Sequence, residues 1–285
     1  MTVAIIWGLS FVAASVVLTT LPPVILAAVR FLIAAAIYSP VIFWEYSRGN
    51  RPSKADLKEL AALGFLSISI YFWLQYTGVA YAGAGVSAVL VTGLIPVLTG
   101  LAGTVILKES FNMKKGLGIT LGLVGVVLIA LPKLLVSNVD WLFFVGVLCL
   151  LGNAVCWSLY STLSRRLMKR IGKPIMVTAY TTFFGMLFLL PMSLTANWGT
   201  VAALSSSQWW SILYLAVICS SGGYLLWNYA LSKMEAVKAT TWLYLEPVAA
   251  FVGSFALFGI VPLPLTILGG AAILIGALLT SRSKQ

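Results

Sequence analysis

The sequence contains no histidine, and only 9% of its 285 residues are charged. Histidine is the commonest general base and a frequent metal ligand, so its absence argues against most hydrolase, protease and metalloenzyme mechanisms. Soluble domains carry roughly a quarter charged residues, so the composition also argues against a water-soluble fold. The three cysteines, Cys149, Cys156 and Cys219, lie in apolar segments without the paired spacing of disulfides or zinc sites, and we expect them to pack.

Other signals are missing as well. No glycine-rich stretch follows a strand or precedes a Lys-Ser/Thr pair, so we expect neither nucleotide-driven activity nor any bound cofactor or metal. The first apolar run has no basic flank and no small-x-small cleavage site before Leu21-Pro22-Pro23. We therefore interpret it as a membrane helix rather than a signal peptide.

Long apolar runs dominate what is present. A membrane span needs about 20 mainly apolar residues, and turn and charge clusters divide the chain into ten such runs. They are residues 2–20, 23–45, 57–77, 83–107, 113–132, 141–164, 174–197, 208–231, 236–259 and 262–281.

The basic residues are distributed asymmetrically over the connections between these spans. Of the 18 Lys and Arg residues, 16 lie in the even-numbered connections or the C-terminal tail, whereas the odd-numbered ones contain only Lys133, and Arg30 lies within the second span. Loops rich in Lys and Arg stay in the cytoplasm. Both termini are therefore predicted to be cytoplasmic, and the formal charge of +11 requires no nucleic-acid partner. The 16 residues are Arg48, Arg51, Lys54, Lys58, Lys108, Lys114, Lys115, Arg165, Arg166, Lys169, Arg170, Lys173, Lys233, Lys238, Arg282 and Lys284.

The two halves of the chain resemble each other. An offset of 151 residues pairs Pro96 with Pro247, and an offset of 150 pairs Trp7 with Trp157. The offset of 151 also pairs Ala88 with Ala239, Gly118 with Gly269 and Gly125 with Gly276. Five spans is an odd number, so the second copy enters the membrane inverted, as in many secondary transporters. We therefore predict an all-α membrane protein with ten transmembrane helices in two inverted repeats, residues 1–135 and 136–285. The alternative is a duplication that only makes a stable bundle.

Four short motifs carry a family resemblance that extends over the whole chain. They are Trp7-Gly8-Leu9-Ser10-Phe11, Ala27-Ala28-Val29-Arg30-Phe31, Leu107-Lys108-Glu109 and Leu245-Glu246-Pro247-Val248. In this order and spacing the chain resembles the EamA-type carriers of the drug/metabolite transporter superfamily, and within them exporters of amino acids, including aromatic ones, and of metabolites. The resemblance implies a monomeric ten-helix carrier of a bacterial-type inner membrane. Such families often carry Gly-Glu after the ninth span, whereas here Gly259 precedes Ile260.

Polar and aromatic residues recur at helical spacing in several spans. One helix face repeats every three to four residues, and hydrocarbon penalises exposed amides, so we expect these faces to share a polar substrate pocket. The alternative for each amide is a hydrogen bond to a neighbouring helix. The residues are Trp7, Tyr71, Gln75, Asn153, Trp157, Tyr160, Tyr224, Asn228, Trp242 and Glu246.

Glu246 lies about 15 Å into its span, near the membrane midplane. A charge there costs about 2.5–3.5 kcal/mol on insertion scales and marks a functional site by default. Pro247 kinks the helix beside it, and Pro96 is expected to do the same in the first half. Three roles stay open for Glu246: binding a substrate ammonium or a coupling proton, pairing with a cation such as Arg30, or packing in the protonated form. Arg30 itself is expected either to bind a carboxylate or to extend toward the membrane surface.

These observations favour a secondary transporter that exports small organic solutes by alternating access, with amino acids or related metabolites first. The runner-up is an exporter of cationic drugs or other metabolites. A passive channel belongs to another class, but the charged rings or carbonyl filter of a channel are absent from the sequence. No nucleophile with a base suggests an enzyme. The glycines of spans five and ten are expected to allow tight helix packing, with a dimer interface or a hinge as alternatives.

Overall fold

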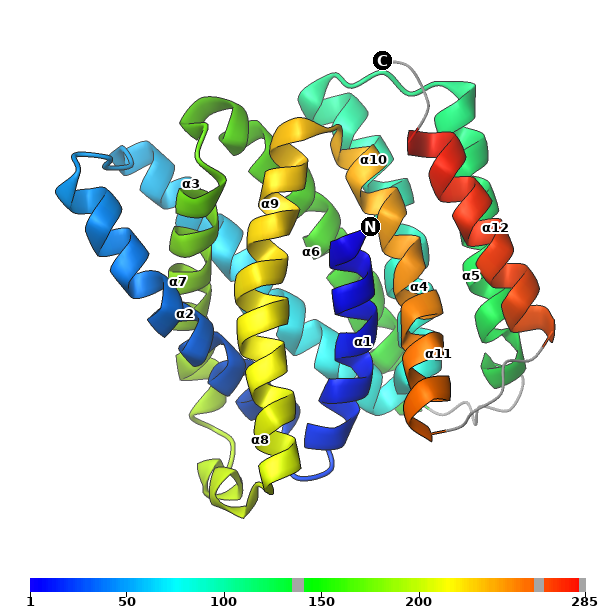
Figure 1. Cartoon of the computed structure of the whole chain (residues 1–285), viewed down its shortest axis with the longest axis horizontal. Helices are drawn as coiled ribbons and strands as arrows, with labels where there is room; N and C mark the ends of the chain where they lie inside the picture. The colour runs from blue at the N-terminus through cyan, green and yellow to red at the C-terminus, as the bar shows by residue number, and fades with distance from the viewer. Residues whose placement is uncertain (135–140, 259–263, 282–285) are drawn as a thin grey trace.

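The computed structural model describes residues 1–134, 141–258 and 264–281, and their secondary structure is helical (Figure 1). Predictions that concern Gly259, Ile260, the 135–140 connection and the cations Arg282 and Lys284 lie outside these residues. The helices are α1 (Thr2–Val17), α2 (Pro23–Ser47), α3 (Lys54–Gly64), η1 (Phe65–Ile70), α4 (Tyr71–Leu107), α5 (Met113–Leu134), α6 (Trp141–Ile171), α7 (Pro174–Ser193), η2 (Trp198–Ala203), α8 (Ser206–Leu213), η3 (Tyr214–Gly223), α9 (Tyr224–Lys233), α10 (Ala236–Thr241), η4 (Trp242–Tyr244), α11 (Leu245–Phe258) and α12 (Pro264–Ser281).

Several of these helices are long and apolar enough to cross a membrane. Within the described residues, six stretches meet that condition, and two shorter helices, Thr2–Val17 and Ile267–Thr280, are also apolar. The six are Pro23–Ser47, Lys54–Ala82, Leu90–Leu107, Trp141–Ile171, Pro174–Ser193 and Ser206–Lys233. The chain is therefore a helical protein whose helices suit a bilayer.

Local sequence explains where the helices start. Ser53 and Asp56 form a capping box at α3, in which each side chain satisfies a backbone N–H of the other residue. Ser205 and Gln208 form the same box at α8. Proline occupies the first turn of α2 and α7, where its missing N–H has no helical partner to lose.

α4 differs from the prediction, because its helical conformation continues where a loop between spans 57–77 and 83–107 was expected. Asn153 Nδ2 donates to the Tyr71 carbonyl, and Ser158 Oγ donates to the Ile95 carbonyl. The two donors are five residues apart on α6, about 7.5 Å, whereas 24 residues of straight helix would separate the acceptors by about 36 Å. α4 must therefore fold back on itself, as its ribbon does in Figure 1. Its second arm lies in the predicted span 83–107, whereas the predicted span 57–77 covers most of α3, all of η1 and the start of the first arm.

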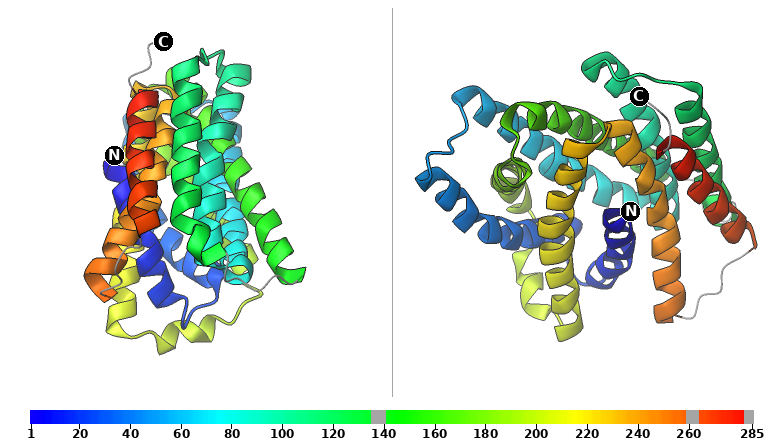
Figure 2. Two further views of the ribbon diagram at one scale, coloured as in Figure 1. Left: turned by 90° about the vertical axis from the view of Figure 1, so that its right-hand side faces the viewer. Right: turned by 45° about the horizontal axis from the view of Figure 1, so that its top comes forward.

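Helices α5 and α12 pack side by side through glycines (Figures 1 and 2). A Cβ atom on Gly118 would lie 2.6 Å from the Gly276 carbonyl oxygen, and one on Gly125 would lie 2.5 Å from the Gly269 carbonyl oxygen. The residue numbers rise along one helix and fall along the other, so the two helices are antiparallel. The small residues bring the two backbones into direct contact, as the glycine pattern predicts.

We expect the Gly118→Ala substitution to destabilise this contact by about 1–3 kcal/mol, because the added methyl group has no space against the α12 backbone. The thermal unfolding midpoint of the detergent-purified protein measures the effect. Gly116→Ala is the matched control on the same helix, since the nearest atom to its Cβ would be 3.6 Å away on the Phe111 ring. Equal midpoints for the two variants would contradict tight α5–α12 packing.

The ion pairs gather at one end of the bundle, at the top of Figure 1. There the connections after α2, α4, α6 and α9 meet, and we call this the charged end. The turn between α1 and α2 and the 3₁₀ helix η2 lie at the opposite end of the bundle. The pairs at the charged end are Glu45 with Lys173, Asp56 and Glu59 with Arg170, Glu59 with Arg166, Glu109 with Arg165, and Glu235 with Lys115 and Lys238.

Candidate functional site

A cavity of about 720 Å³, including the part open to solvent, lies between α1, α2, the first arm of α4, α6 and α9. The cavity follows α1 from Trp7 to Leu18, about 16 Å, so it reaches the turn between α1 and α2, at the end opposite the charged end. Its lining residues are Trp7, Ser10, Phe11, Ala14, Ser15, Leu18, Arg30, Tyr71, Phe72, Gln75, Tyr76, Val79, Trp157, Tyr224 and Glu246.

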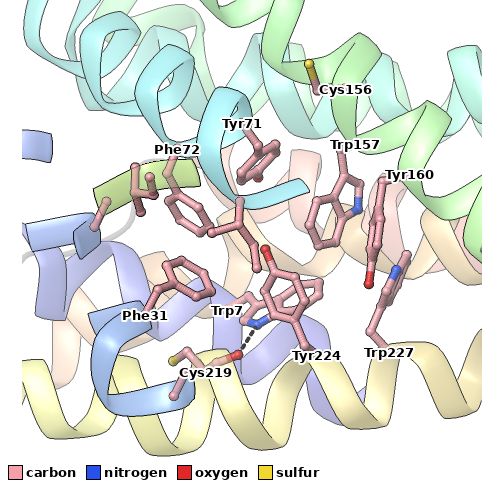
Figure 3. Packing of buried hydrophobic residues seen from close by; sticks show 14 of the residues in the cluster. Trp7, Phe31, Tyr71, Phe72, Cys156, Trp157, Tyr160, Cys219, Tyr224 and Trp227 are labelled. Atoms are coloured by element: carbon pink, nitrogen blue, oxygen red, sulfur yellow. Dashed lines mark hydrogen bonds between the residues drawn. The ribbon is translucent and has the colours of Figure 1, made fainter. Parts of the chain in front are cut away.

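Aromatic rings close the inner end of the cavity (Figure 3). The rings of Trp7 and Trp157 meet edge to face with centroids 5.1 Å apart. Tyr71 lies 5.0 Å from Trp157, and Tyr224 lies 5.7 Å from Trp7. These rings offer flat apolar surface and favourable geometry for stacking with an aromatic or apolar ligand group. The Nε1 of Trp157 is buried without a hydrogen-bond partner in the described part of the chain, so it is an available donor.

Two π-helical segments, η1 and η3, hold these aromatic residues in place. A π segment lengthens the helical hydrogen-bond pattern and is frequent at functional sites. Carbonyl groups in the two segments accept side-chain hydrogen bonds: Cys219 from Trp7 at 3.0 Å, and Ser67 from Tyr224 at 3.0 Å. Neither π-helical segment was predicted from the sequence, because no motif in either one signals a π-helix.

Arg30 is 4% exposed and lines the cavity from α2. Its Nε donates to Ser220 Oγ at 2.9 Å, and its Nη1 donates to the Tyr76 hydroxyl at 3.2 Å. The guanidinium also lies 4.6 Å from the Phe72 ring centroid, a cation–π contact. An arginine has five N–H donors, so these bonds leave donors available, and no carboxylate among the described residues pairs with this cation.

Glu246 lines the cavity from the start of α11 and is 7% exposed. The α-helical pattern of α10 gives way to the 3₁₀ turn η4 directly before Glu246 and Pro247. Gly8 allows α1 to approach here, because a Cβ atom on it would lie 2.5 Å from the Glu246 carbonyl oxygen. No hydrogen bond or ion pair to the Glu246 carboxyl group occurs among the described residues.

The cavity therefore holds a buried guanidinium and a buried carboxyl group that are not paired with each other in the described structure. The expected alternative of an Arg30–Glu246 ion pair is not found among the described residues. An unpaired buried charge costs several kcal/mol, so Arg30 gains from an anionic ligand, and an ionised Glu246 would gain from a cationic one.

Some predicted site residues lie elsewhere. Asn153 donates to the Tyr71 carbonyl, and Asn228 accepts from Tyr160 and Ser164 and donates to Thr178. These amides join neighbouring helices, which was the stated alternative for them. Trp242 packs against the small core around Tyr244. None of Asn153, Tyr160, Asn228 and Trp242 lines the cavity. Pro96 and Pro247 were both predicted to kink their helices. Pro247 follows the 3₁₀ turn η4, whereas α4 remains α-helical through Pro96.

The cavity also contains polar residues that were not predicted, above all Tyr76, Ser10 and Ser15. Tyr76 follows Gln75 directly, and a search for arginine partners in span three could have found it. No group of three or more His, Cys, Asp or Glu side chains that could hold a metal ion occurs among the residues described.

Known proteins resemble this chain in sequence and in fold. A profile described as the EamA-like transporter family matches residues 1–131 and again residues 144–282. A solved crystal structure shares the fold with a TM-score of 0.81 at 20% identity, over 98% of this chain and 94% of the other.

Curated relatives match over most of their length. The uncharacterized transporter YyaM of Bacillus subtilis is 29% identical over 90% of this chain and 83% of its own length. An uncharacterized transporter of Archaeoglobus fulgidus is 27% identical over 99% and 95%. A protein of Streptantibioticus cattleyicolor named "Probable terminal-alkyne amino-acid exporter" is 28% identical over 82% and 76%.

Proposed function

The chain belongs to the EamA-like transporter family, and from this premise we propose that it is a secondary carrier that exports amino acids by alternating access. The observation that carries the proposal is the cavity with unpaired Arg30 and Glu246 in its wall. An amino acid presents a carboxylate and an ammonium group, and it would satisfy both charges at once. The rings of Trp7, Trp157 and Tyr224 would accept an apolar or aromatic side chain. The amino-acid exporter among the relatives supports the same substrate class.

We further propose that the ten spans form two inverted repeats, residues 1–135 and 136–285. The family profile matches the chain twice, once in each half. Proline lies inside α2 at Pro40 and inside α7 at Pro191, an offset of 151 residues. The same offset exchanges the Gly118–Gly276 contact with the Gly269–Gly125 contact, as a two-fold axis between the halves requires. Carriers with this plan bind substrate between the halves and rock one against the other.

The orientation follows from the basic loops. With the charged end in the cytoplasm of a bacterial-type inner membrane, both termini face the cytoplasm and the cavity opens outward. The lipid bilayer is then the main partner besides the substrate, and the unit is a monomer. The cavity thus belongs to the outward-facing state of the cycle, from which an exported solute leaves.

Counterflow tests the proposal. Purified protein in liposomes is loaded with one unlabelled amino acid at a time, and uptake of the same labelled amino acid is followed with and without a pH gradient. We expect saturable uptake that internal unlabelled solute accelerates for at least one amino acid. Uptake that is linear in concentration and insensitive to internal solute would indicate a channel.

The runner-up substrate is a cationic drug, which the lone carboxylate and the rings would suit. Arg30 in the same cavity opposes it, because a cation without a carboxylate leaves that guanidinium unpaired. Counterflow of a cationic dye without movement of any amino acid would replace the first proposal with this one.

We expect the Trp157→Phe substitution to weaken substrate binding about 3- to 10-fold and to destabilise the fold less than Trp7→Phe does, because the Trp157 N–H has no hydrogen-bond partner among the described residues. Trp7→Phe is the matched variant, because the Trp7 N–H donates to the Cys219 carbonyl. Loss of this hydrogen bond should lower the thermal unfolding midpoint of Trp7→Phe further than that of Trp157→Phe. Binding titrations and thermal unfolding separate the two effects, and a stability loss in Trp157→Phe alone would contradict this assignment.

A further inference from the structure

We propose that a second polar site, between α6, α7 and α9 and closed in this structure, is the cytoplasmic half of the substrate path. We call it the cytoplasmic vestibule and define it by Tyr160, Ser161, Ser164, Thr182 and Trp227. Its ligand is the zwitterionic solute and the water that accompanies it. The inference rests on the proposed alternating-access function and names residues for the state that the structure does not show.

The correspondence between α1 and α6 locates the vestibule. The offset of 150 residues that pairs Trp7 with Trp157 carries the cavity face of α1 onto one face of α6. In α1 this face is open, and Ser15 is exposed. In α6 the equivalent face is buried throughout. The pairs are Trp7 with Trp157, Ser10 with Tyr160, Phe11 with Ser161, Ala14 with Ser164, Ser15 with Arg165 and Leu18 with Met168.

The buried face of α6 is more polar than a packing surface needs to be. The hydroxyls of Ser161 and Thr182 and the Nε1 of Trp227 are buried without a hydrogen-bond partner in the described structure. A buried polar group left unpaired costs about 1–3 kcal/mol, and these three lie on α6, α7 and α9, the helices that enclose the proposed vestibule. Such a cost has a function if water and substrate reach these groups in the other state of the cycle.

Two buried ion pairs between the halves lie where the vestibule would open. Arg165 Nε lies 2.6 Å from Glu109 Oε1, and the same guanidinium donates to the carbonyls of Leu231 and Met234. Lys115 Nζ lies 2.5 Å from Glu235 Oε2. Each pair joins a residue of the first half to one of the second, so the charged end cannot open unless both pairs separate.

Most of the few acidic residues of the chain form ion pairs between the two halves. Of its seven Asp and Glu residues, five pair with cations of the opposite half at the charged end. The sixth, Asp140, lies outside the described residues, and the seventh is Glu246 in the cavity. The five are Glu45, Asp56, Glu59, Glu109 and Glu235. The inter-half ion pairs thus close the cytoplasmic side while the outer cavity is open.

Cysteine accessibility tests the vestibule without reference to the substrate. In a background where Cys149, Cys156 and Cys219 are alanine, single Ser161→Cys and Ser15→Cys variants are treated with a membrane-impermeant thiol reagent. The reagent is applied to inside-out and to right-side-out vesicles. We expect Ser161→Cys to react only from the cytoplasmic face, and Ser15→Cys only from the outer face.

The ion pairs supply the second arm of the experiment. Adding Glu109→Gln should accelerate the reaction of Ser161→Cys about tenfold and slow that of Ser15→Cys, since it shifts the population toward the inward-facing state. If Glu109→Gln does not insert in the membrane, Glu235→Gln breaks the other pair and gives the same test. Thr280→Cys is the control, because Thr280 is fully buried at the same end in the α5–α12 contact.

Three results would overturn the vestibule: no reaction of Ser161→Cys in either background, reaction from the outer face, or an equal rate for Thr280→Cys. Cytoplasmic labelling of Ser161→Cys together with no amino-acid counterflow would overturn the proposed substrate and support the vestibule. The two proposals can therefore fail separately.

Discussion

The Glu246→Gln substitution is expected to reduce saturable amino-acid transport roughly 30-fold or more. The Glu246 carboxyl group is buried in the cavity wall and has no partner among the described residues. In the proposed mechanism it binds the substrate ammonium. Truncating one member of a buried charge pair costs about 2–5 kcal/mol, and each 1.4 kcal/mol is a factor of ten. Initial rates of counterflow in liposomes over a range of substrate concentrations measure the effect.

Controls separate a binding role of Glu246 from a structural one. Glutamine keeps the shape of the side chain, so Glu246→Gln should unfold at the same temperature as the parent or a higher one, because a costly buried charge has been removed. Glu246→Asp keeps the charge and should retain part of the activity. Transport unchanged in Glu246→Gln would leave Glu246 a structural residue, and a large drop in its unfolding midpoint would point to the same conclusion.

The second large effect is expected from Arg30→Gln, which should change the preferred substrate. The guanidinium is held by Ser220 and Tyr76 with donors left over, and these donors would bind the substrate carboxylate. Without the cation, binding of the amino acid should fall about 30-fold or more, whereas an amine that lacks the carboxylate should bind more tightly than it does to the parent. Competition binding with both ligands measures the switch.

Arg30→Lys is the informative control for this prediction. Lysine keeps the charge but loses the planar fork that binds a carboxylate at two points and that contacts the Phe72 ring. We expect intermediate affinity for the amino acid and no gain for the amine. Equal losses for both ligands in Arg30→Gln would mean that Arg30 only supports the fold.

Much of the fold could be predicted from the sequence because hydrophobic length and loop charge act locally. The helices at Pro23, Lys54 and Pro174 begin near the expected positions, and the basic connections gather at one end as the charge count predicts. The reversal of the chain between the predicted spans 57–77 and 83–107 was expected, but the helical conformation of the residues that make it was not. The contacts that hold both arms of α4 against α6, at Tyr71 and Ile95, join residues more than 60 positions apart along the chain and could not be predicted.

The candidate site could likewise be predicted only in part. Helical spacing gave Gln75 and Asn228 the same prediction, a place in the pocket wall, but Gln75 lines the cavity whereas Asn228 bonds to neighbouring helices. Periodicity tells which face of a helix is inside, not what lies opposite to it. The partner Ser220 of Arg30 could not be predicted either, because it lies 190 residues away in the sequence.

The most direct test of the central claim, a cavity that recognises both charges of an amino acid, is equilibrium binding of three matched probes to the purified protein. Phenylalanine carries both charges, phenethylamine only the ammonium, and 3-phenylpropionate only the carboxylate, on the same aromatic side chain. Arg30 and Glu246 together predict that phenylalanine binds at least about tenfold more tightly than either of the others. Binding of phenethylamine as tight as that of phenylalanine would contradict the claim and favour a carrier of cations.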